Sequence, residues 1–281
     1  MRALLNIIRF QVWWIGRLLF KPTNLEIHLA DHCNLNCASC SHYSPLAAQK
    51  FCDVDVLTAS LSKLSRFENE FRSIRLLGGE PLLNQNVTKI ISLIRMCFPN
   101  IRIELVTNGL LLMPPFREYI NDAFWTACRN NKIMIAVTIY PSMIDTETIK
   151  KTCLERGVKF RVYGNRTGND GFNRFLLDPK RQGKKMNYYR CQEIDCLQLV
   201  GNKIFSCAQC AYVGSLNQSF GYSFEQNKKD YIAVDEISRA FAIRRFRLRA
   251  KPFCKYCVFP HPKTDWSKSQ KKAEEWVQRI E

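Results

Sequence analysis

The stretch LEIHLADHCNLNCASC, residues 25–40, joins a strand-like apolar run to three closely spaced cysteines. The apolar run predicts a β-strand, and Cys33, Cys37 and Cys40 follow it at a C-x3-C-x2-C spacing. Disulfide geometry can join at most one pair of three such thiols, so the spacing indicates three ligands of a metal site whose fourth position is open. A [4Fe–4S] cluster fits this pattern, because one short loop can bind three irons and leave the fourth free.

Zinc is the alternative metal for this loop, with His32 or His42 as the fourth ligand of a zinc knuckle. The chain has thirteen cysteines among 281 residues and no recognisable secretory signal. That usage indicates metal-bound thiolates in a reducing compartment, so we expect a cytoplasmic protein. Hydrophobic residues make up 46% and charged residues 24%, which is typical of a globular fold with one large domain or a main domain and an appendage.

Apolar runs and helix-like patterns alternate after the first strand. Further strands are predicted at residues 73–77, 101–106, 132–140 and 158–163. Such alternation implies parallel strands with right-handed crossovers. The expected fold is therefore α/β, a partial (β/α)6 TIM-like barrel whose sixth strand the sequence does not place. Parallel sheets and barrels carry their active sites at the C-terminal ends of the strands, where the cysteines lie.

Two further motifs follow predicted strands. Gly-Gly-Glu-Pro (78–81) comes after the second strand and Thr-Asn-Gly (107–109) after the third. Together with the cysteine spacing, in this order, they resemble the radical S-adenosylmethionine (SAM) superfamily over residues 25 to about 163. Many members of that family carry an aromatic residue just before the third cysteine, and this chain has Ser39 there.

The resemblance implies a catalytic, SAM-ligating [4Fe–4S] cluster on Cys33, Cys37 and Cys40. The reduced cluster would cleave SAM to a 5′-deoxyadenosyl radical, which abstracts hydrogen from a substrate carbon. The side chains expected around SAM are those of the later strand ends. They are Gly78 and Gly79 beside the methionine moiety, Glu80 at its ammonium, Asn108 at its carboxylate or ribose, and Thr138 or Tyr140 facing the same cavity.

A second set of cysteines lies late in the chain, around a predicted hairpin with a Gly201-Asn202 turn. The set resembles the auxiliary-cluster modules called SPASM, or twitch in the shorter form. The resemblance implies one auxiliary [4Fe–4S] cluster, although a structural zinc fits the two C-x2-C pairs as well. The candidate ligands are Cys191, Cys196, Cys207, Cys210, Cys254 and Cys257, with Cys191 and Cys196 as alternatives for the first position. The remaining thiols within helical patterns, Cys52, Cys97, Cys128 and Cys153, are expected to be small core residues.

These patterns divide the chain into a radical SAM core, flanked by an N-terminal helix, a cysteine-rich α+β module and a C-terminal helix. The expected bounds are 1–22 for the amphipathic N-terminal helix, 23–165 for the core (extending to about 187), 188–260 for the module and 261–281 for the basic C-terminal helix.

The net charge is +17, and basic residues gather at 179–190, 244–251 and 268–272. This charge favours anionic partners such as phosphates, nucleotides, acidic glycans or an anionic membrane, and solvated basic faces account for it equally well. The N-terminal helix fits either peripheral contact with the inner face of the membrane or packing on the body of the protein. Arg9 and Arg17 interrupt its apolar run, so we expect no membrane span there.

The expected function is that of a radical SAM oxidoreductase or modifying enzyme, served by a reductase or flavodoxin-type electron donor. The basic charge tilts the substrate toward an anionic small molecule, such as a nucleotide-linked or phosphorylated sugar. A radical SAM peptide maturase is the alternative within the superfamily. A zinc-stapled nucleic-acid-binding protein is the alternative from another class, and it leaves the Gly-Gly-Glu-Pro motif unexplained.

Overall fold

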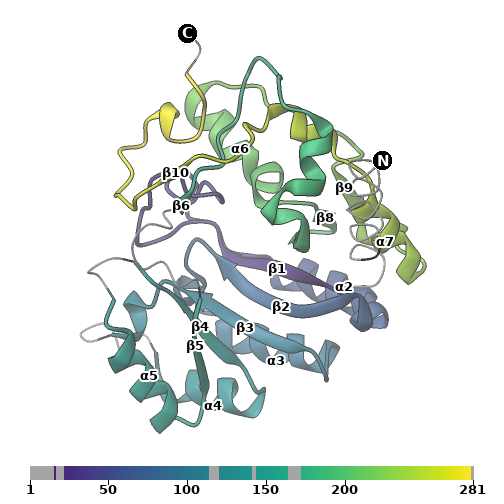
Figure 1. Cartoon of the computed structure of the whole chain (residues 1–281). Helices are drawn as coiled ribbons and strands as arrows, with labels where there is room; N and C mark the ends of the chain where they lie inside the picture. The colour runs from purple at the N-terminus through teal and green to yellow at the C-terminus, as the bar shows by residue number, and fades with distance from the viewer. Residues whose placement is uncertain (1–15, 17–21, 114–119, 141–143, 164–171, 280–281) are drawn as a thin grey trace, which may run out of the picture.

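The computed structural model describes residue 16 and residues 22–113, 120–140, 144–163 and 172–279. Within these ranges the centre of the molecule is an eight-stranded sheet in the order β5-β4-β3-β2-β1-β7-β8-β9 (Figure 1). Its strands are β1 (Thr23–Ala30), β2 (Phe71–Gly78), β3 (Arg102–Thr107), β4 (Met134–Thr138), β5 (Lys159–Tyr163), β7 (Cys196–Val200), β8 (Lys203–Phe205) and β9 (Tyr231–Ala233). Strands β1 to β5 pair in parallel, which confirms the predicted partial barrel.

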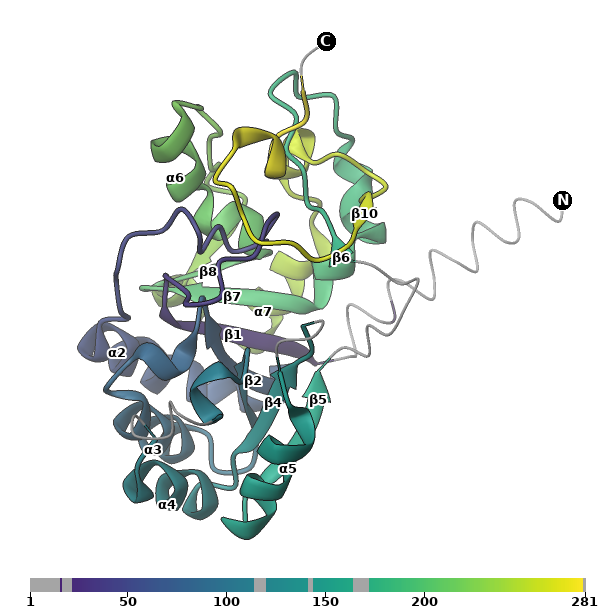
Figure 2. The same cartoon turned by 90° about the vertical axis from the view of Figure 1, so that its left-hand side faces the viewer.

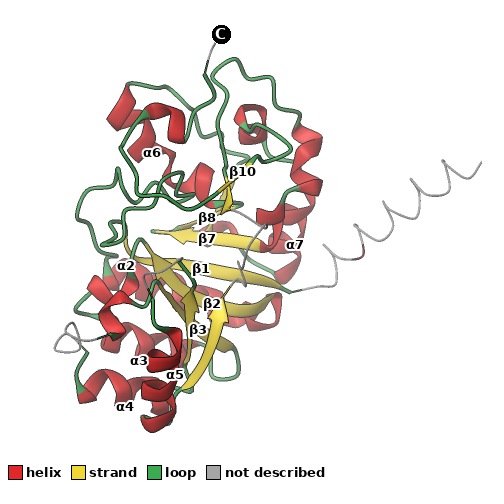
Figure 3. Cartoon of the chain, turned by 60° about the vertical axis from the view of Figure 1, so that its left-hand side comes forward, coloured by secondary structure: helices red, strands yellow, loops and turns green. Residues whose placement is uncertain are grey.

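Helices connect the parallel strands and cover the outer face of the sheet (Figure 3). They are α2 (Val54–Leu64), α3 (Val87–Cys97), α4 (Asp122–Asn130) and α5 (Thr146–Glu155). Asp145 caps α5 as an N-cap residue should, because its carboxylate accepts from the Thr148 amide at 3.0 Å. The thiols of Cys128 and Cys153 are buried in the main core and those of Cys52 and Cys97 pack at its edge, as predicted.

The C-terminal half supplies the sixth parallel strand of this sheet. Strand β7 lies beside β1 on the side opposite β2 and pairs with it in parallel. It forms the predicted hairpin with β8, and the turn between them is Gly201-Asn202. Helices α6 (Ala208–Phe220) and α7 (Ala240–Leu248) follow. The hairpin of the cysteine-rich region therefore continues the sheet of the core instead of forming a separate one.

The last part of the chain differs from the prediction. In place of a basic helix over 261–281, the described residues form the short strand β10 (Lys263–Thr264), which pairs with β6 (Phe172–Asn173), and a 3-10 turn at Ala273–Glu275. We name residues 265–279 the C-terminal strap. Figure 2 shows it, in yellow, passing beside the purple loop that follows β1.

The predicted N-terminal helix at 1–22 lies outside the described residues, apart from Gly16 and Pro22. Within the described ranges, no helix is both long enough and apolar enough to cross a bilayer.

Candidate functional site

A cavity of about 310 Å³ lies at the C-terminal ends of the parallel strands. Residues from all the predicted motifs line it: Cys33, Cys37, Cys40, Gly78, Gly79, Thr107, Asn108, Thr138 and Tyr140. The expected convergence of the cysteine, glycine and Thr-Asn-Gly motifs at this edge of the sheet is therefore confirmed. The parallel pairing produces it, because neighbouring parallel strands end at the same edge.

The cysteine loop, residues 31–46, winds tightly so that its sulfurs share this cavity. Its backbone is left-handed at Asn36 (φ 59°), Ser39 (φ 55°) and Tyr43 (φ 55°), which reverses the chain within a few residues. The Tyr43 side chain is fully buried and packs against Trp276. All three cysteines of the loop are free thiols, so their sulfurs are available as ligands.

Hydrogen-bond donors surround two of these sulfurs. The Trp266 indole Nε1–H donates to Cys37 Sγ at 3.1 Å, and Cys33 Sγ accepts from the Leu35 amide at 3.4 Å and from Asn108 Nδ2 at 3.6 Å. Burial raises the pKa of Cys33 to about 12 and that of Cys37 to about 11. These two sulfurs are therefore neutral thiols unless a metal stabilises the thiolate, while donors to bind that thiolate are already in place.

The C-terminal strap holds the cysteine loop through backbone and side-chain hydrogen bonds. The amide of Ala38 donates to Ser267 O at 2.9 Å, and the amide of Ser269 donates to Asn36 O at 2.8 Å. The Ser39 hydroxyl donates to Glu275 O at 2.8 Å, so the residue that departs from the family pattern has its own partner. Trp276 Nε1 donates to Cys40 O at 2.9 Å. The two backbone bonds, at Ser267 and Ser269, oppose a helix in this part of the strap, because they use its backbone groups in an extended form.

The two glycines allow β2 to lie directly against the cysteine loop. A Cβ on Gly78 would stand 2.2 Å from Ala30 O, and one on Gly79 would stand 1.9 Å from His32 O. The amides of Gly79 and Glu80 donate to those same carbonyls, at 2.8 Å and 3.0 Å. Both glycines also line the cavity, as predicted. Their local role is to permit this backbone contact, which no side chain could allow.

Glu80, which the resemblance places at the ammonium of SAM, is bound by its own neighbours in the chain. Its side chain is fully buried and does not line the cavity. Its carboxylate accepts from the Thr107 hydroxyl at 2.7 Å, the Asn108 amide at 2.9 Å and the Leu82 amide at 3.1 Å. Burial raises the pKa of Glu80 to about 7, although these three hydrogen bonds by themselves lower it. Glu80 thus fixes the Thr-Asn-Gly turn, which places Asn108 beside Cys33 and Asn34.

Aromatic side chains form one wall of the cavity. Tyr140, just past the end of β4, stacks on Phe172 with ring centroids 6.0 Å apart and meets Trp266 edge-on at 6.1 Å. All three residues line the cavity, and Thr138 lies beside them at the end of β4. The sequence indicated Thr138 and Tyr140 through their place at a strand end, but nothing local to Phe172 or Trp266 pointed to this wall.

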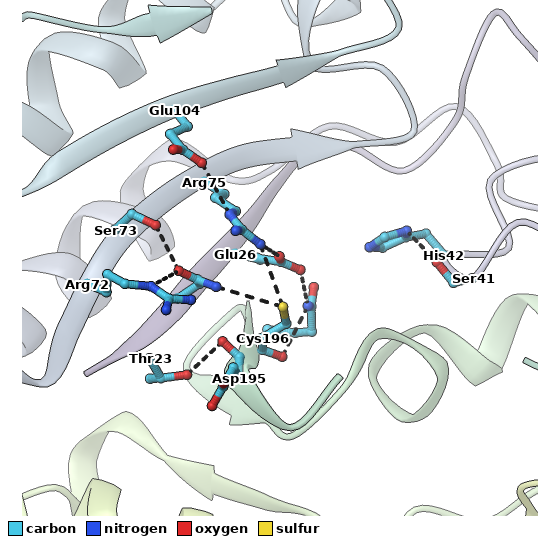
Figure 4. A network of polar contacts seen from close by, with 12 residues as sticks. Thr23, Glu26, Ser41, His42, Arg72, Ser73, Arg75, Glu104, Asp195 and Cys196 are labelled. Atoms are coloured by element: carbon cyan, nitrogen blue, oxygen red, sulfur yellow. Dashed lines mark hydrogen bonds and ion pairs between the residues drawn. The ribbon is translucent and has the colours of Figure 1, made fainter. Parts of the chain in front are cut away.

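The opposite part of the cavity carries carboxylates. Glu26 and Glu193 line it together with Cys196, and the described lining includes no lysine or arginine. Figure 4 shows Arg75 between Glu104 and Glu26, with its guanidinium directed toward Cys196. Burial raises the pKa of Glu193 to about 7. The part of a ligand that reaches this end meets hydrogen-bond acceptors rather than cations.

The late cysteines divide into two groups. Cys196 lies in the cavity, where its Sγ is 3.6 Å from Arg75 NH1. The other five lie together: burial raises the pKa of these thiols, and neighbouring thiols of the same group raise it further in Cys191, Cys207, Cys210 and Cys257. Cys254 belongs to this group because its charge raises the pKa of each of these four thiols. Across the described ranges, no three His, Cys, Asp or Glu side chains are arranged to hold a single metal ion.

Comparison with known proteins identifies the first half of the chain. Residues 27–151 match the family model of the radical SAM superfamily. A GTP 3′,8-cyclase from Syntrophomonas wolfei subsp. wolfei is 36% identical over 99 residues, which are 31% of this chain and 27% of that protein. Molybdenum cofactor biosynthesis protein 1 of Drosophila melanogaster is 32% identical over 92 residues, 32% of this chain and 16% of that protein. The chain spans about a quarter of the length of the first of these curated relatives.

Among solved structures, BtrN in complex with AdoMet and 2-DOIA aligns with 88% of this chain and 97% of its own, at 13% identity and a TM-score of 0.45. The match to the family model covers β1 through most of α5, the part of the chain whose motifs build the cavity. Residues 27–151, somewhat under half of the chain, therefore match the radical SAM superfamily, whose cofactors are SAM and a [4Fe–4S] cluster that binds it.

Proposed function

We propose that Cys33, Cys37 and Cys40 hold the catalytic [4Fe–4S] cluster and that SAM occupies the adjoining cavity. The supporting observation is the loop itself, with three free sulfurs at one cavity and N–H donors directed at two of them. When bound, the cluster and SAM supply an electron and a carbon radical that can remove a hydrogen atom from substrate. This donor set fits such a cluster, because its cysteines bind separate irons and need not converge on one ion.

The chain's own residues would position SAM and exclude water. Gly78, Gly79, Asn108 and Thr138 line the cavity next to the cysteine loop and are the candidate SAM contacts. Glu80 acts one step away, by fixing the turn that carries Asn108. Tyr140 and the aromatic side chains beside it close one side, which keeps the reacting atoms in an apolar setting.

The cavity favours a small polar substrate with hydroxyl or ammonium groups. Its volume of about 310 Å³ has to hold SAM as well, so the chemistry of the lining is what indicates the class of substrate. Glu26 and Glu193 at the far end are suited to accept hydrogen bonds from such groups. The net charge predicted an anionic substrate, but the described lining of the cavity contains no lysine or arginine. A phosphate group of the substrate would therefore have to lie away from Glu26 and Glu193.

We further propose that Cys191, Cys207, Cys254 and Cys257 hold an auxiliary [4Fe–4S] cluster, with Cys210 nearby. The support is the mutual proximity of these thiols and the separate position of Cys196. A flavodoxin-type reductase fits the need for an external electron donor.

This assignment separates the two candidates for the first auxiliary ligand. Replacing Cys191 with Ala should lower bound iron by about four atoms per chain, because a [4Fe–4S] cluster would lose one of its four cysteine ligands. Replacing Cys196 with Ala should leave the iron content unchanged, since that thiol lies beside Arg75 in the cavity. Iron and sulfide analysis of both variants after anaerobic reconstitution measures the difference, and the reverse pattern would overturn the assignment.

The test of the proposed function is SAM cleavage by the reconstituted wild-type protein. Reduced with dithionite under anaerobic conditions, it should convert SAM to 5′-deoxyadenosine and methionine. A protein that carries its full complement of iron and sulfide yet forms no 5′-deoxyadenosine would contradict the proposal. Candidate hydroxylated and aminated small molecules can then be tested for whether they increase the rate of 5′-deoxyadenosine formation.

A further inference from the structure

Trp266 of the C-terminal strap makes a short hydrogen bond to a sulfur of the cysteine loop. Its indole Nε1–H donates to Cys37 Sγ at 3.1 Å, whereas the donors to Cys33 Sγ stand at 3.4 Å and 3.6 Å. Trp266 lies 229 residues from Cys37 in the chain and belongs to no motif that surrounds the cysteines. The contact is therefore made by tertiary structure alone.

The indole is held in place from several sides. Backbone hydrogen bonds join the strap to both neighbours of Cys37, from Ala38 N to Ser267 O at 2.9 Å and from Ser269 N to Asn36 O at 2.8 Å. Between them, Lys268 and Cys37 form an isolated antiparallel bridge. Tyr140 meets the Trp266 ring edge-on at 6.1 Å. Because the backbone pairing fixes the strap at this register, the N–H is directed at one particular sulfur.

A hydrogen bond to a ligating sulfur changes the reduction potential of an iron–sulfur cluster. One-electron reduction makes the cluster and its thiolates more negative, and a donor stabilises the more negative state by the larger amount. The contact between Trp266 and Cys37 is partly buried, so the donor is more effective there than it would be in water. The N–H of Trp266 should therefore raise the potential at which the cluster bound to Cys37 accepts its electron.

We propose that Trp266 is a positioning residue that acts through Cys37 to raise the reduction potential of the catalytic cluster. This inference rests on the proposed function, because it requires that Cys37 ligate the cluster. It also makes the strap part of the catalytic centre: the cluster reaches its working potential only when residues 265–269 are paired with the cysteine loop. A ligand in the cavity touches the same indole, which lines it.

The test is an EPR-monitored redox titration of wild type and of Trp266→Phe, following the signal that changes when SAM is added. Phenylalanine keeps an aromatic ring and removes the N–H. At a given solution potential, the reduced-to-oxidised ratio of this cluster in Trp266→Phe should be about tenfold lower than in wild type, a shift of about 59 mV for a one-electron couple. Trp125→Phe is the matched control, since that tryptophan packs in the main core beside Phe124 and does not line the cavity. Its cluster should titrate as in wild type.

A second measurement uses the wild-type protein, so it does not depend on how the variant folds. With tryptophan labelled by ¹⁵N in the indole ring, pulsed EPR of the reduced, SAM-responsive cluster should detect a ¹⁵N coupling transmitted through the hydrogen bond. Trp125→Phe should retain the coupling and Trp266→Phe should lose it. Equal potentials in wild type and Trp266→Phe, or no ¹⁵N coupling in wild type, would overturn the inference. A wild-type protein without any SAM-responsive signal would instead overturn the proposed function.

Discussion

Replacing Cys37 with Ala is expected to remove about four irons per chain and to abolish 5′-deoxyadenosine formation, because two thiolates cannot hold a [4Fe–4S] cluster built for three cysteines and an open iron. Cys37 has the central position in the loop and shares its cavity with Cys33 and Cys40. The measurement is iron and sulfide content together with 5′-deoxyadenosine yield after anaerobic reconstitution.

Cys97→Ala is the control for this loss, since that thiol packs at the edge of the main core on α3 and does not line the cavity. It should retain both the iron and the activity. If Cys37→Ala kept the iron content of wild type and still cleaved SAM, the assignment of the catalytic cluster to this loop would be wrong.

Replacing Glu80 with Ala should lower the free energy of unfolding of the cluster-free protein by about 3 kcal/mol, even with no SAM present. The carboxylate accepts three hydrogen bonds in a fully buried position, and Ala would leave the Thr107 hydroxyl and the amides of Asn108 and Leu82 without an acceptor. Each buried donor left unsatisfied costs about 1–3 kcal/mol, and partial rearrangement keeps the sum near the value given. Urea unfolding under reducing conditions measures the change.

Glu68→Ala provides a matched comparison, because the Glu68 carboxylate accepts a single amide bond, from Asn100, at an exposed position. Its removal should cost less than about 1 kcal/mol. If Glu80→Ala unfolded like wild type in the absence of SAM and was impaired only in SAM binding, Glu80 would be a ligand of SAM, as the sequence alone suggested. The two roles therefore predict different results in the same experiment.

The parallel core was predictable from the sequence because its strands are buried on both faces. Apolar residues recur along them at alternate positions or in short runs, as Leu25, Ile27 and Leu29 do in β1, of which all eight residues are buried. The order of strands also made the convergence of the motifs predictable, since it follows from parallel pairing alone. The sixth parallel strand was not placed, because the pairing of β7 with β1 joins residues 172 positions apart, from Asn24 to Cys196, and depends on tertiary structure.

In the strap, the local sequence pattern predicts the wrong secondary structure, and at Glu80 it predicts only part of the surroundings. Residues 268–275 are rich in Lys, Glu and Gln, which favour helices, yet the backbone of Ser269 pairs with the cysteine loop and only a short 3-10 turn forms, at Ala273–Glu275. The place of Glu80 in Gly-Gly-Glu-Pro predicted a contact with SAM, and nothing local to it predicted the three donors from neighbouring turns that bind its carboxylate. Likewise, spacing alone left Cys191 and Cys196 as alternatives, and the position of Cys196 beside Arg75 supports the proposed choice of Cys191.

The central claim is that HCNLNCASC builds a cluster with an open iron that binds SAM. The most direct test is EPR spectroscopy of the dithionite-reduced, reconstituted wild-type protein with and without SAM, on samples whose iron, sulfide and zinc have been determined. We expect a [4Fe–4S]1+ signal whose shape changes when SAM is added, in a protein with about eight irons per chain, four for each cluster. A colourless protein that contains zinc and gives no such signal would contradict the account.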